Sequence, residues 1–578
     1  YAFNKAKEMV KNMKRKLIYI ITLGMILMLT ACDVEKELQE DNTLYSDEMN
    51  HEKENKGNGE DKDAKELLEE LWDKVESEAS QEEKINKVAP LQLQLSEQYS
   101  EEGMENESDE YGYTTLCSVS WQNLILADES AERYPELAKK LQEKNTELNE
   151  YNRKLKEDLL VSAKEIYEYQ VDYFNPLSSN SSFCVQRADN NILSVREDFY
   201  DYWGGAHGMY GSYGINYDVN TGEELVITDV MTDFGSLPAI LSEKIMEQYA
   251  DEYETFESLK ETLEGYSAED YCWTMGYGEI TFYFQPYEIA SYAMGLIKTT
   301  IWFDEMPELF QEEYAKVENE EYSMALSLNQ EIELDLDAED GKKNRLFVSD
   351  YYETAEEIEY GIKRISIMLD DCSYDETECY GYEINPYLLC VGDTENKKYY
   401  LYVETVAEND YTTISVYDLN GGEVTLNGRL DGTGFAGYWD ENVGEYGMYY
   451  KDVFNNPQEF QLGTRLDILG TWSGIKTYAV NEETGLPKAN EDYYVLSEDS
   501  NSMKSVIPLE VMMLPEEKKE KLSAGTNFYP IRTDGKTYVD MRLEDGRECR
   551  IYVESEGWDL KINGVDQWEC FETLWYAG

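Results

Sequence analysis

The spacing of apolar residues changes along the chain at about residue 330. Before that point, apolar side chains recur every three or four residues between residues 137 and 166, which predicts a long amphipathic helix that ends near Pro176. A second stripe at residues 237–249 predicts another helix. Short apolar runs around residues 116–121, 183–185, 192–195 and 214–219 predict strands. The first part of the chain therefore mixes helices with strands.

After residue 330 the apolar runs are short, and turn residues separate them. These runs predict strands at residues 387–391, 399–406, 413–417 and 424–430, and the Asn420-Gly421-Gly422 turn suits a hairpin. Four strands in this stretch suggest one propeller-like blade, although no repeat is visible. Further strands, such as residues 550–553, and a short helical stretch after Pro515 follow. We expect a β-rich domain at 330–460 and a C-terminal β-rich domain at 461–578.

The N-terminal region carries a pattern typical of secretion. Three basic residues at 14–16 precede an uncharged, mostly apolar stretch that ends in Leu29-Thr30-Ala31-Cys32. This ending resembles the lipobox of bacterial lipoproteins, which implies that residues 1–31 are a signal peptide and that Cys32 is diacylated. The alternative is an ordinary cleaved signal that leaves Cys32 as a free thiol. Residues 32–110 are strongly acidic and poor in apolar side chains, so we expect a mostly disordered tether there.

The charge balance excludes one class of partner. The 578 residues include 50 Lys and Arg against 121 Asp and Glu, which gives a formal net charge of −71. Nucleic-acid binding needs a basic surface, so we expect no nucleic-acid partner. Only two histidines occur, His51 and His207, which excludes mechanisms that need several imidazoles. Carboxylate pairs are so numerous that no single pair indicates a glycosidase site.

Several ordered motifs between residues 111 and 315 indicate a known family. The motifs are Leu193-Ser194-Val195, Gly204-Gly205-Ala206-His207-Gly208, residues 217–225, residues 134–137, and residues 282–290 followed by Gly295. Together they resemble the tandem extracytoplasmic module of the PdaC/RsiV type, with a PdaC-like subdomain at 111–205 and an RsiV-like subdomain at 206–316. The resemblance implies an α+β fold in which helices pack on antiparallel sheets.

The same resemblance implies a role in the bacterial envelope without fixing a reaction. Deacetylases of the PdaC type carry NodB-type chemistry in a separate metal-dependent domain that uses an Asp with paired histidines, and no histidine follows His207 here. Regulators of the RsiV type carry a cytoplasmic sigma-binding segment and a membrane-spanning helix, which a lipobox replaces here. We therefore expect no deacetylase activity of that type and favour a protein that is not an enzyme.

The Gly-rich turn contains the most conspicuous single side chain, His207. An imidazole at such a turn could act as a base or as a metal ligand. The small residues Gly204, Gly205 and Ala206 permit positive φ or close backbone approach. We favour a structural role, in which His207 donates to a carbonyl that fixes the turn.

An acidic run at residues 335–341 is a weaker candidate, for calcium. Asp335, Asp337 and Asp340 precede Gly341 in an order that resembles a calcium loop. The spacing has one residue too many, and no Glu closes the loop as in an EF-hand. A solvated turn is the favoured interpretation, and calcium is the one cofactor that the sequence suggests.

Cysteines and tyrosines offer two further sets of candidates. Eight cysteines remain beyond Cys32, and the nearest disulfide candidates are Cys372 with Cys379 and Cys549 with Cys570; free buried thiols are the alternative. The chain also holds 49 tyrosines. Clusters at residues 200–203 and 446–450 suit the binding of sugars, peptides or proteins, although half-buried strand faces explain any one cluster more simply.

These features together predict a binding or sensing protein held by a lipid anchor at the outer face of the bacterial cytoplasmic membrane. The expected ligand is associated with the wall: lysozyme or another cationic protein, which an acidic chain attracts electrostatically, or peptidoglycan. The alternative is a cell-wall hydrolase that acts on glycan or peptide through unidentified carboxylates.

Overall fold

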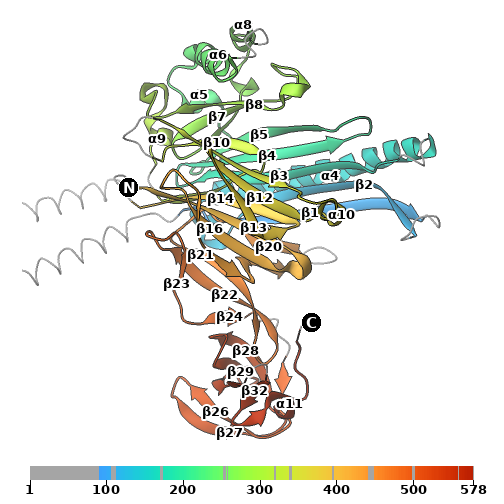
Figure 1. The fold of residues 1–578 in the computed structure, drawn as a ribbon, viewed down its shortest axis with the longest axis vertical. Helices are drawn as coiled ribbons and strands as arrows, with labels where there is room; N and C mark the ends of the chain where they lie inside the picture. Colours follow the sequence, from blue (N-terminus) through green and yellow to red (C-terminus); the bar gives the residue numbers. More distant parts are fainter. Residues whose placement is uncertain are drawn as a thin grey trace, which may run out of the picture. The chain divides into compact units, whose positions relative to one another are not determined.

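The computed structural model describes residues 90–105, 112–169, 174–250, 256, 258–317, 321–336, 342–392, 396–440, 448–496, 502–556 and 559–576. Antiparallel sheets dominate these residues, and a few helices cover them (Figure 1). The α+β class with a β-rich C-terminal region is therefore confirmed. No helix in the described ranges is long and apolar enough to cross a membrane. The predicted signal peptide, Cys32 and most of the predicted tether lie outside the described residues.

A seven-stranded sheet forms the first layer. Its strand order is β19-β20-β1-β2-β3-β4-β5. The strands are β1 (Leu93–Glu105), β2 (Tyr113–Leu126), β3 (Leu177–Ala188), β4 (Ile192–Tyr202), β5 (Met209–Asp218), β19 (Gly437–Asp440) and β20 (Met448–Asp452). All neighbours are antiparallel except β2 and β3, which are parallel. Parallel neighbours need a long crossover, and here the crossover is helical.

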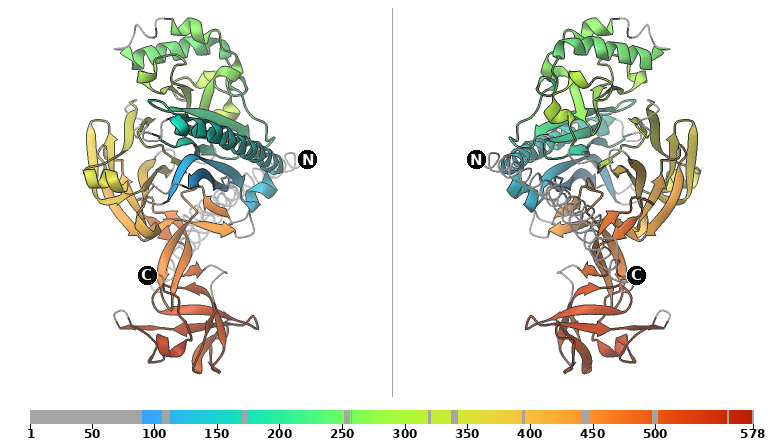
Figure 2. Two further views of the ribbon diagram at one scale, coloured as in Figure 1. Left: turned by 90° about the vertical axis from the view of Figure 1, so that its right-hand side faces the viewer. Right: turned by 90° about the vertical axis from the view of Figure 1, so that its left-hand side faces the viewer.

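The crossover contains α3 (Asp128–Arg133) and the long helix α4 (Pro135–Tyr169), which confirms the helix predicted at residues 137–166. Pro135 suits the first helical position because its missing N–H would have no partner there. The apolar stripe of α4 packs on the seven-stranded sheet, and Figure 2 shows the helix lying against this sheet. Its buried side chains include Leu137, Leu141, Leu159 and Ala163.

A three-stranded sheet follows along the chain, and one of its faces packs on short helices. Its strands are β6 (Cys272–Met275), β7 (Glu279–Phe284) and β8 (Ile297–Trp302). The helical elements are α5 (Ile227–Val230), η3 (Phe234–Ser236), α6 (Leu237–Gln248), α8 (Leu259–Leu263), η5 (Ala268–Asp270), η6 (Tyr292–Met294), η7 (Pro307–Leu309) and α9 (Glu312–Ala315). The core between them contains Leu237, Leu241 and Ile245 of α6, as the apolar stripe at residues 237–249 predicts.

Two antiparallel sheets make up the next region. The first has the order β10-β11-β12-β13, and the second has the order β17-β16-β15-β14-β9. Their elements are β9 (Tyr322–Ala325), β10 (Gln330–Leu334), β11 (Asn344–Tyr351), α10 (Ala355–Tyr360), β12 (Lys363–Leu369), β13 (Cys372–Gly381), β14 (Glu383–Val391), β15 (Lys398–Val406), η8 (Glu408–Asp410), β16 (Thr412–Asp418) and β17 (Thr425–Asp431).

The five-stranded sheet is buried on both faces, which explains the almost unbroken apolar run of β15. Leu401 and Val403 face the four-stranded sheet, whereas Tyr400 and Tyr402 face a second apolar cluster that includes Phe435. The four predicted strands and the hairpin after β16 are confirmed. The propeller-like blade is not: β9 adds a fifth strand, and the sheet belongs to a stack of layers.

The last sheet contains eleven strands with a branched order. Its strands are β18 (Thr433–Phe435), β21 (Phe460–Asp467), β22 (Thr471–Val480), β23 (Pro487–Ala489), β24 (Tyr494–Leu496), β25 (Met503–Lys504), β26 (Leu509–Leu514), β27 (Lys518–Leu522), β28 (Asn527–Thr533), β29 (Tyr538–Leu543) and β30 (Glu548–Tyr552). Three short strands and a helix complete the chain: β31 (Glu554–Glu556), β32 (Asp559–Ile562), β33 (Val565–Asp566) and α11 (Gln567–Cys570).

The helical stretch predicted after Pro515 is wrong. Residues 518–522 form β27, which pairs with β26 in a hairpin. Their sequence, Lys-Lys-Glu-Lys-Leu, contains good helix formers, but β27 is the last strand in the order of the sheet and so lies at its edge. Charged side chains, lysine above all, suit an edge strand because they discourage further pairing. The tertiary position outweighs the local helix preference.

Two of the expected domain boundaries cut through sheets. The tether was expected to reach residue 110, but residues 93–105 form β1, which pairs with β2 along its whole length. On its other edge, β1 pairs with β20, from the expected domain at 330–460. The boundary after residue 460 separates β18 from its partner β21. The expected domains are therefore interlaced. The sequence did not predict this, because pairing between distant segments leaves no mark in the local sequence.

Arg187 joins the seven-stranded sheet to the segment around the three-stranded sheet. Its guanidinium is fully buried and pairs with Asp189 at 2.6 Å. It also donates to the carbonyl oxygens of Gly276 at 3.3 Å, Tyr314 at 2.7 Å and Lys316 at 3.3 Å. Asp189 accepts two backbone N–H groups with its other oxygen. The planar fork of arginine is suited to such a set of acceptors.

Candidate functional site

A groove of about 920 Å³ lies in the β-rich part of the chain. We call it the tyrosine groove. It is bounded by the end of β13, the η8 loop, β18, β20 and the facing ends of β21 and β22. Several separate stretches of chain meet there, and the interlaced strands described above hold them together. The fold therefore builds the groove from segments that are far apart in sequence.

Half-exposed tyrosine rings line this groove. The exposed fractions are 50% for Tyr380, 38% for Tyr382, 51% for Tyr411 and 43% for Tyr449. Large aromatic side chains that stay this exposed on a folded protein offer apolar faces together with a polar hydroxyl group. Such rings suit a ligand that has both apolar faces and hydroxyl groups.

Glycines keep the groove open between these rings. A Cβ atom added to Gly463 would meet no heavy atom within 4 Å, so the space above this residue is empty. Gly434 is different, since a Cβ there would lie 2.9 Å from both Glu404 Oε1 and Thr412 Oγ1. The first glycine therefore leaves room for a ligand, and the second permits close packing of β18 on the sheet below.

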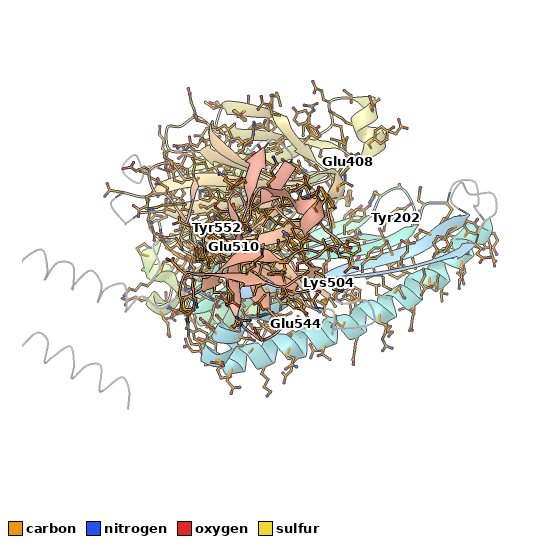
Figure 3. The ribbon with its side chains drawn as sticks, turned by 90° about the horizontal axis from the view of Figure 1, so that it is seen from below. Tyr202, Glu408, Lys504, Glu510, Glu544 and Tyr552 are labelled. Carbon is orange, nitrogen blue, oxygen red and sulfur yellow. The ribbon has the colours of Figure 1, made fainter. Side chains whose placement is uncertain are left out.

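The groove lining carries little charge. Among the described lining residues the charged side chains are Glu408 and Arg465. The hydroxyl of Tyr382 donates to Glu408 at 3.3 Å, and Arg465 lies 3.8 Å from Asp467. Figure 3 labels Glu408 among the side chains of this part of the chain. A nearly neutral lining is unusual in a chain with a net charge of −71.

A buried ion pair supports the groove from beneath. The Glu404 carboxylate accepts the Lys451 ammonium at 2.6 Å, the Phe435 N–H at 2.7 Å and the Asn385 amide at 3.2 Å. Burial lowers the pKa of Lys451, but Tyr387 and Glu404 outweigh that effect and raise it overall. Lys451 therefore stays charged and ties β20 to β15 below the groove.

The carboxyl groups of the groove lining can be compared with those that glycoside hydrolysis needs. Glycoside hydrolysis uses two carboxyl groups about 5–9.5 Å apart. The described groove lining supplies one, Glu408. No group of three or more potential metal ligands occurs among the described residues.

The Gly-rich turn lies between β4 and β5, outside the groove. Gly204 and Gly205 have φ values of 91° and 97°, which only glycine adopts readily. The His207 ring stacks on Tyr292 with 4.1 Å between ring centroids, and Nδ1 lies 3.0 Å from the Gly208 carbonyl oxygen. A carbonyl oxygen only accepts, so Nδ1 donates in this contact. Both contacts are made to residues at or near the turn, so they hold the imidazole ring in place there.

The two tyrosine clusters predicted from sequence lie on different surfaces. Tyr200 and Trp203 are each 43% exposed, and the hydroxyl of Tyr202, labelled in Figure 3, donates to the Gly205 carbonyl at 3.1 Å. In the second cluster, Tyr449 lines the tyrosine groove. Tyr450 instead stacks on a neighbouring strand, β19.

The predicted disulfides are absent from the structure. All eight cysteines beyond Cys32 are free thiols. Cys372 and Cys379 lie in the same strand, β13, rather than on two sides of a turn. Cys549 and Cys570 are buried in one core cluster as separate thiols. Burial raises the pKa of Cys549 to about 12 and that of Cys570 to about 11, so both stay protonated at neutral pH.

The calcium candidates are only partly described. Asp335 forms an ion pair with Lys343, at 2.7 Å. Lys343 also pairs with Asp304 and lies over the Trp302 ring at 4.3 Å. Asp337 and Asp340 lie outside the described residues. A lysine therefore occupies the one candidate carboxylate whose surroundings are described.

Sequence reasoning missed most of the groove. Only Tyr449 belongs to a cluster that the sequence singles out. Tyr380 lies near the end of β13, and Tyr382 and Tyr411 stand in short connections next to strands. A usable signal exists, since tyrosine beside Gly or Asn at a strand end is poorly placed for burial. Which of these rings converge depends on the pairing of distant strands.

Two family models match the first half of the described chain. Residues 129–210 match the model described as deacetylase PdaC, and residues 228–304 match the model described as a protein of unknown function, DUF3298. No curated protein matches the chain.

Two solved structures of the DUF3298 family are similar to part of the chain. A member from Bacteroides fragilis is 20% identical, with 38% of this chain and 94% of that chain covered and a TM-score of 0.28. A protein from Pseudomonas aeruginosa is 18% identical, with 39% and 97% covered and a TM-score of 0.27. The family matches confirm the resemblance seen in the sequence motifs. The chain thus carries a PdaC-type segment followed by a DUF3298 segment, domains of extracytoplasmic cell-envelope proteins.

Proposed function

We propose that this protein is a lipid-anchored receptor of the bacterial envelope that binds a saccharide strand of the wall in the tyrosine groove. The observation that carries the proposal is the set of half-exposed tyrosine rings around the open space at Gly463. The glycan of peptidoglycan is the matching component of the wall. The PdaC-type and DUF3298 segments support the cellular location of such a ligand.

A saccharide fits the groove better than a charged polymer. Pyranose rings present apolar C–H faces that stack on aromatic rings, and their hydroxyl groups bond to tyrosine and backbone groups. An anionic polymer would meet a chain of net charge −71 and only one arginine in the groove lining. A neutral glycan escapes this repulsion.

Two other functions remain as rivals to be tested. A wall hydrolase would need a second carboxyl group beside Glu408. A receptor for lysozyme, or for another cationic protein, would use the acidity of the chain, which speeds encounters with basic partners. Such attraction alone would fade at 0.15 M salt, where the Debye length is about 8 Å.

Calorimetry of the full chain with N-acetylglucosamine oligomers tests the proposal. Replacing Tyr411 with Ala removes one stacking ring and should weaken binding by about 1–2 kcal/mol, or roughly tenfold in Kd. Gly463→Leu should block the groove, since the added side chain enters empty space and leaves the strand intact. Tyr552→Ala is the matched control, because Tyr552 is also 51% exposed and lies on β30, away from the groove lining (Figure 3).

Three results would distinguish the candidates. Saccharide binding that is lost in Tyr411→Ala and kept in Tyr552→Ala supports the proposal. Release of new reducing ends from peptidoglycan that stops in Glu408→Gln would favour the hydrolase. Lysozyme binding that persists at 0.15 M salt, with no saccharide binding, would replace the glycan by a protein ligand.

A further inference from the structure

A second cavity, of about 600 Å³, lies where the seven-stranded sheet, the three-stranded sheet and the β-rich region meet. We call it the junction cavity. Its walls come from β4, α6, β7, β8, β9, β10, β14 and β15. The size lies in the range of about 300–1,000 Å³ typical of small-ligand sites, which often form between domains. The proposed glycan function makes no use of this cavity.

One face of the β7–β8 pair forms a wall of the junction cavity and has an ordered sequence of polar groups. The register places Glu279 opposite Trp302, Thr281 opposite Thr300, and Tyr283 opposite Lys298. All six side chains line the cavity. The two threonine hydroxyl groups bond to each other at 3.1 Å. An acidic end and a basic end are thus separated by a neutral hydroxyl pair.

Lys298 makes the basic end. Its ammonium group donates to the Glu331 backbone carbonyl and, among the described residues, to no other acceptor. An ammonium group has three donors, so two of them are available to a ligand. Burial, and next the nearby Arg196, lower the pKa of Lys298 to about 8. Arg196 itself is held by Asp198, at 3.0 Å. Lys298 is therefore a mostly charged group at neutral pH, and it forms no ion pair with a carboxylate of the described residues, although Glu331, Asp198 and Glu333 lie near enough to act on its charge.

Glu279 makes the acidic end. Its carboxyl group accepts the Gly278 N–H at 2.9 Å, and it forms no ion pair with another described residue. Burial raises its pKa above the ordinary value. The neighbouring Trp302 indole donates to Glu333 at 3.0 Å, which adds a second carboxylate at this end. A cationic ligand group placed here would meet two carboxyl groups.

We propose that the junction cavity binds a short peptide with free termini, whose carboxylate pairs with Lys298 and whose ammonium group pairs with Glu279. Four residues along the paired strands separate the backbone positions of the two charged residues by about 14 Å on the sheet. An extended dipeptide or tripeptide, at about 3.5 Å per residue, spans about 7–10 Å. A charge-assisted hydrogen bond of about 2.8 Å at each end brings the total to about 13–16 Å, which matches the separation.

A ligand with one charge would leave one end of the cavity without a partner. A simple anion would use Lys298 and leave the carboxyl groups of Glu279 and Glu333 facing it. A simple cation would approach Glu279 but would leave the ammonium group of Lys298 without an anionic partner. The opposed ends therefore select a molecule that carries both charges, in a fixed order and at a fixed spacing.

Calorimetry of the full chain with dialanine and trialanine tests this inference. The same peptides with an acetylated N-terminus or an amidated C-terminus each lose one end charge. Each block should weaken binding about tenfold to hundredfold, the effect of one hydrogen bond to a charged group. The Lys298→Gln variant should weaken the free peptide by a similar factor and should leave the amidated peptide unaffected. Glu279→Gln should show the same relation with the acetylated peptide.

The matched control is Lys260→Gln, since Lys260 is an exposed lysine on α8, outside the cavity lining. Two results together support the inference. Lys260→Gln leaves the binding of the free peptides unchanged, and each cavity variant weakens the free peptide but leaves unaffected the peptide whose corresponding end is blocked. No heat with either free peptide, or equal affinity for the free and blocked forms of the wild-type chain, overturns it. The comparison of blocked forms uses the wild-type chain alone, so it decides the matter even if a variant fails to fold. Neither outcome bears on saccharide binding in the tyrosine groove.

Discussion

Replacing Arg187 with Met should loosen the junction between the seven-stranded sheet and the segment around β7. The side chain is fully buried and donates to Asp189 and to three backbone carbonyl groups. Met fills a similar volume but leaves the Asp189 carboxylate buried without its cation. Breaking a buried ion pair on one side costs about 3–5 kcal/mol.

The expected loss can be divided by two companion variants. Arg187→Lys keeps the charge but cannot reach all the acceptors with a planar fork, so we expect an intermediate loss of about 1–3 kcal/mol. The double variant Arg187→Met with Asp189→Asn removes the uncompensated charge. It should recover part of the loss, since Asp189 also accepts the N–H groups of Asn191 and Ile192 and the amide oxygen of Asn can keep those bonds.

Hydrogen exchange of the full chain, followed by mass spectrometry, measures this effect locally. A loss of 3–5 kcal/mol corresponds to about 10²- to 4 × 10³-fold faster exchange, since about 1.4 kcal/mol is tenfold. The change should appear in peptides from β7 and leave those from β29 unaffected, because β29 belongs to another core cluster. Less than a tenfold change in β7, or equal changes in both strands, would refute the reasoning.

Three other predictions follow from single groups. Glu376 is paired with Arg429. Burial raises the pKa of Glu376, but hydrogen bonds, above all the one with Arg429, lower this pKa overall. The stabilising effect of Glu376 is therefore present above pH 4.5 and is lost as the pH falls through the folded-state pKa. Relative to its stability at neutral pH, the wild-type chain should therefore begin to unfold at a higher pH than the Glu376→Gln variant. Circular dichroism during acid titration measures this difference. Lys451→Met should cost about 3–5 kcal/mol in urea unfolding, because it leaves Glu404 buried without its cation. Cys32→Ala should abolish partition into detergent, since two acyl chains anchor a protein stably; release of the wild-type protein into the medium would contradict the lipid anchor.

Local patterns predicted the elements that depend on neighbouring residues. The stripe in α4, the β4–β5 turn with its glycines, and the hairpin after β16 follow from periodicity and turn chemistry. The pairing of Gln94 with Asp452 depends on segments more than 350 positions apart, and no local pattern encodes it. The tyrosine groove presents the same difficulty, because Tyr380 and Tyr449 come from strands of two different sheets.

The position of β20 beside β1 has a consequence for how the chain folds while it is being made. One edge of β1 has no neighbour until residues 448–452 exist, some 340 residues after β1 ends at Glu105. At about 5–20 residues per second, synthesis takes about 17–70 s to close that gap. An unpaired edge invites association with other chains, and charged side chains discourage it. The glutamates at 97, 101, 102 and 105 lie along this strand, directly after the residues 94–96 that β20 later covers, and we expect their charge to discourage such association during synthesis.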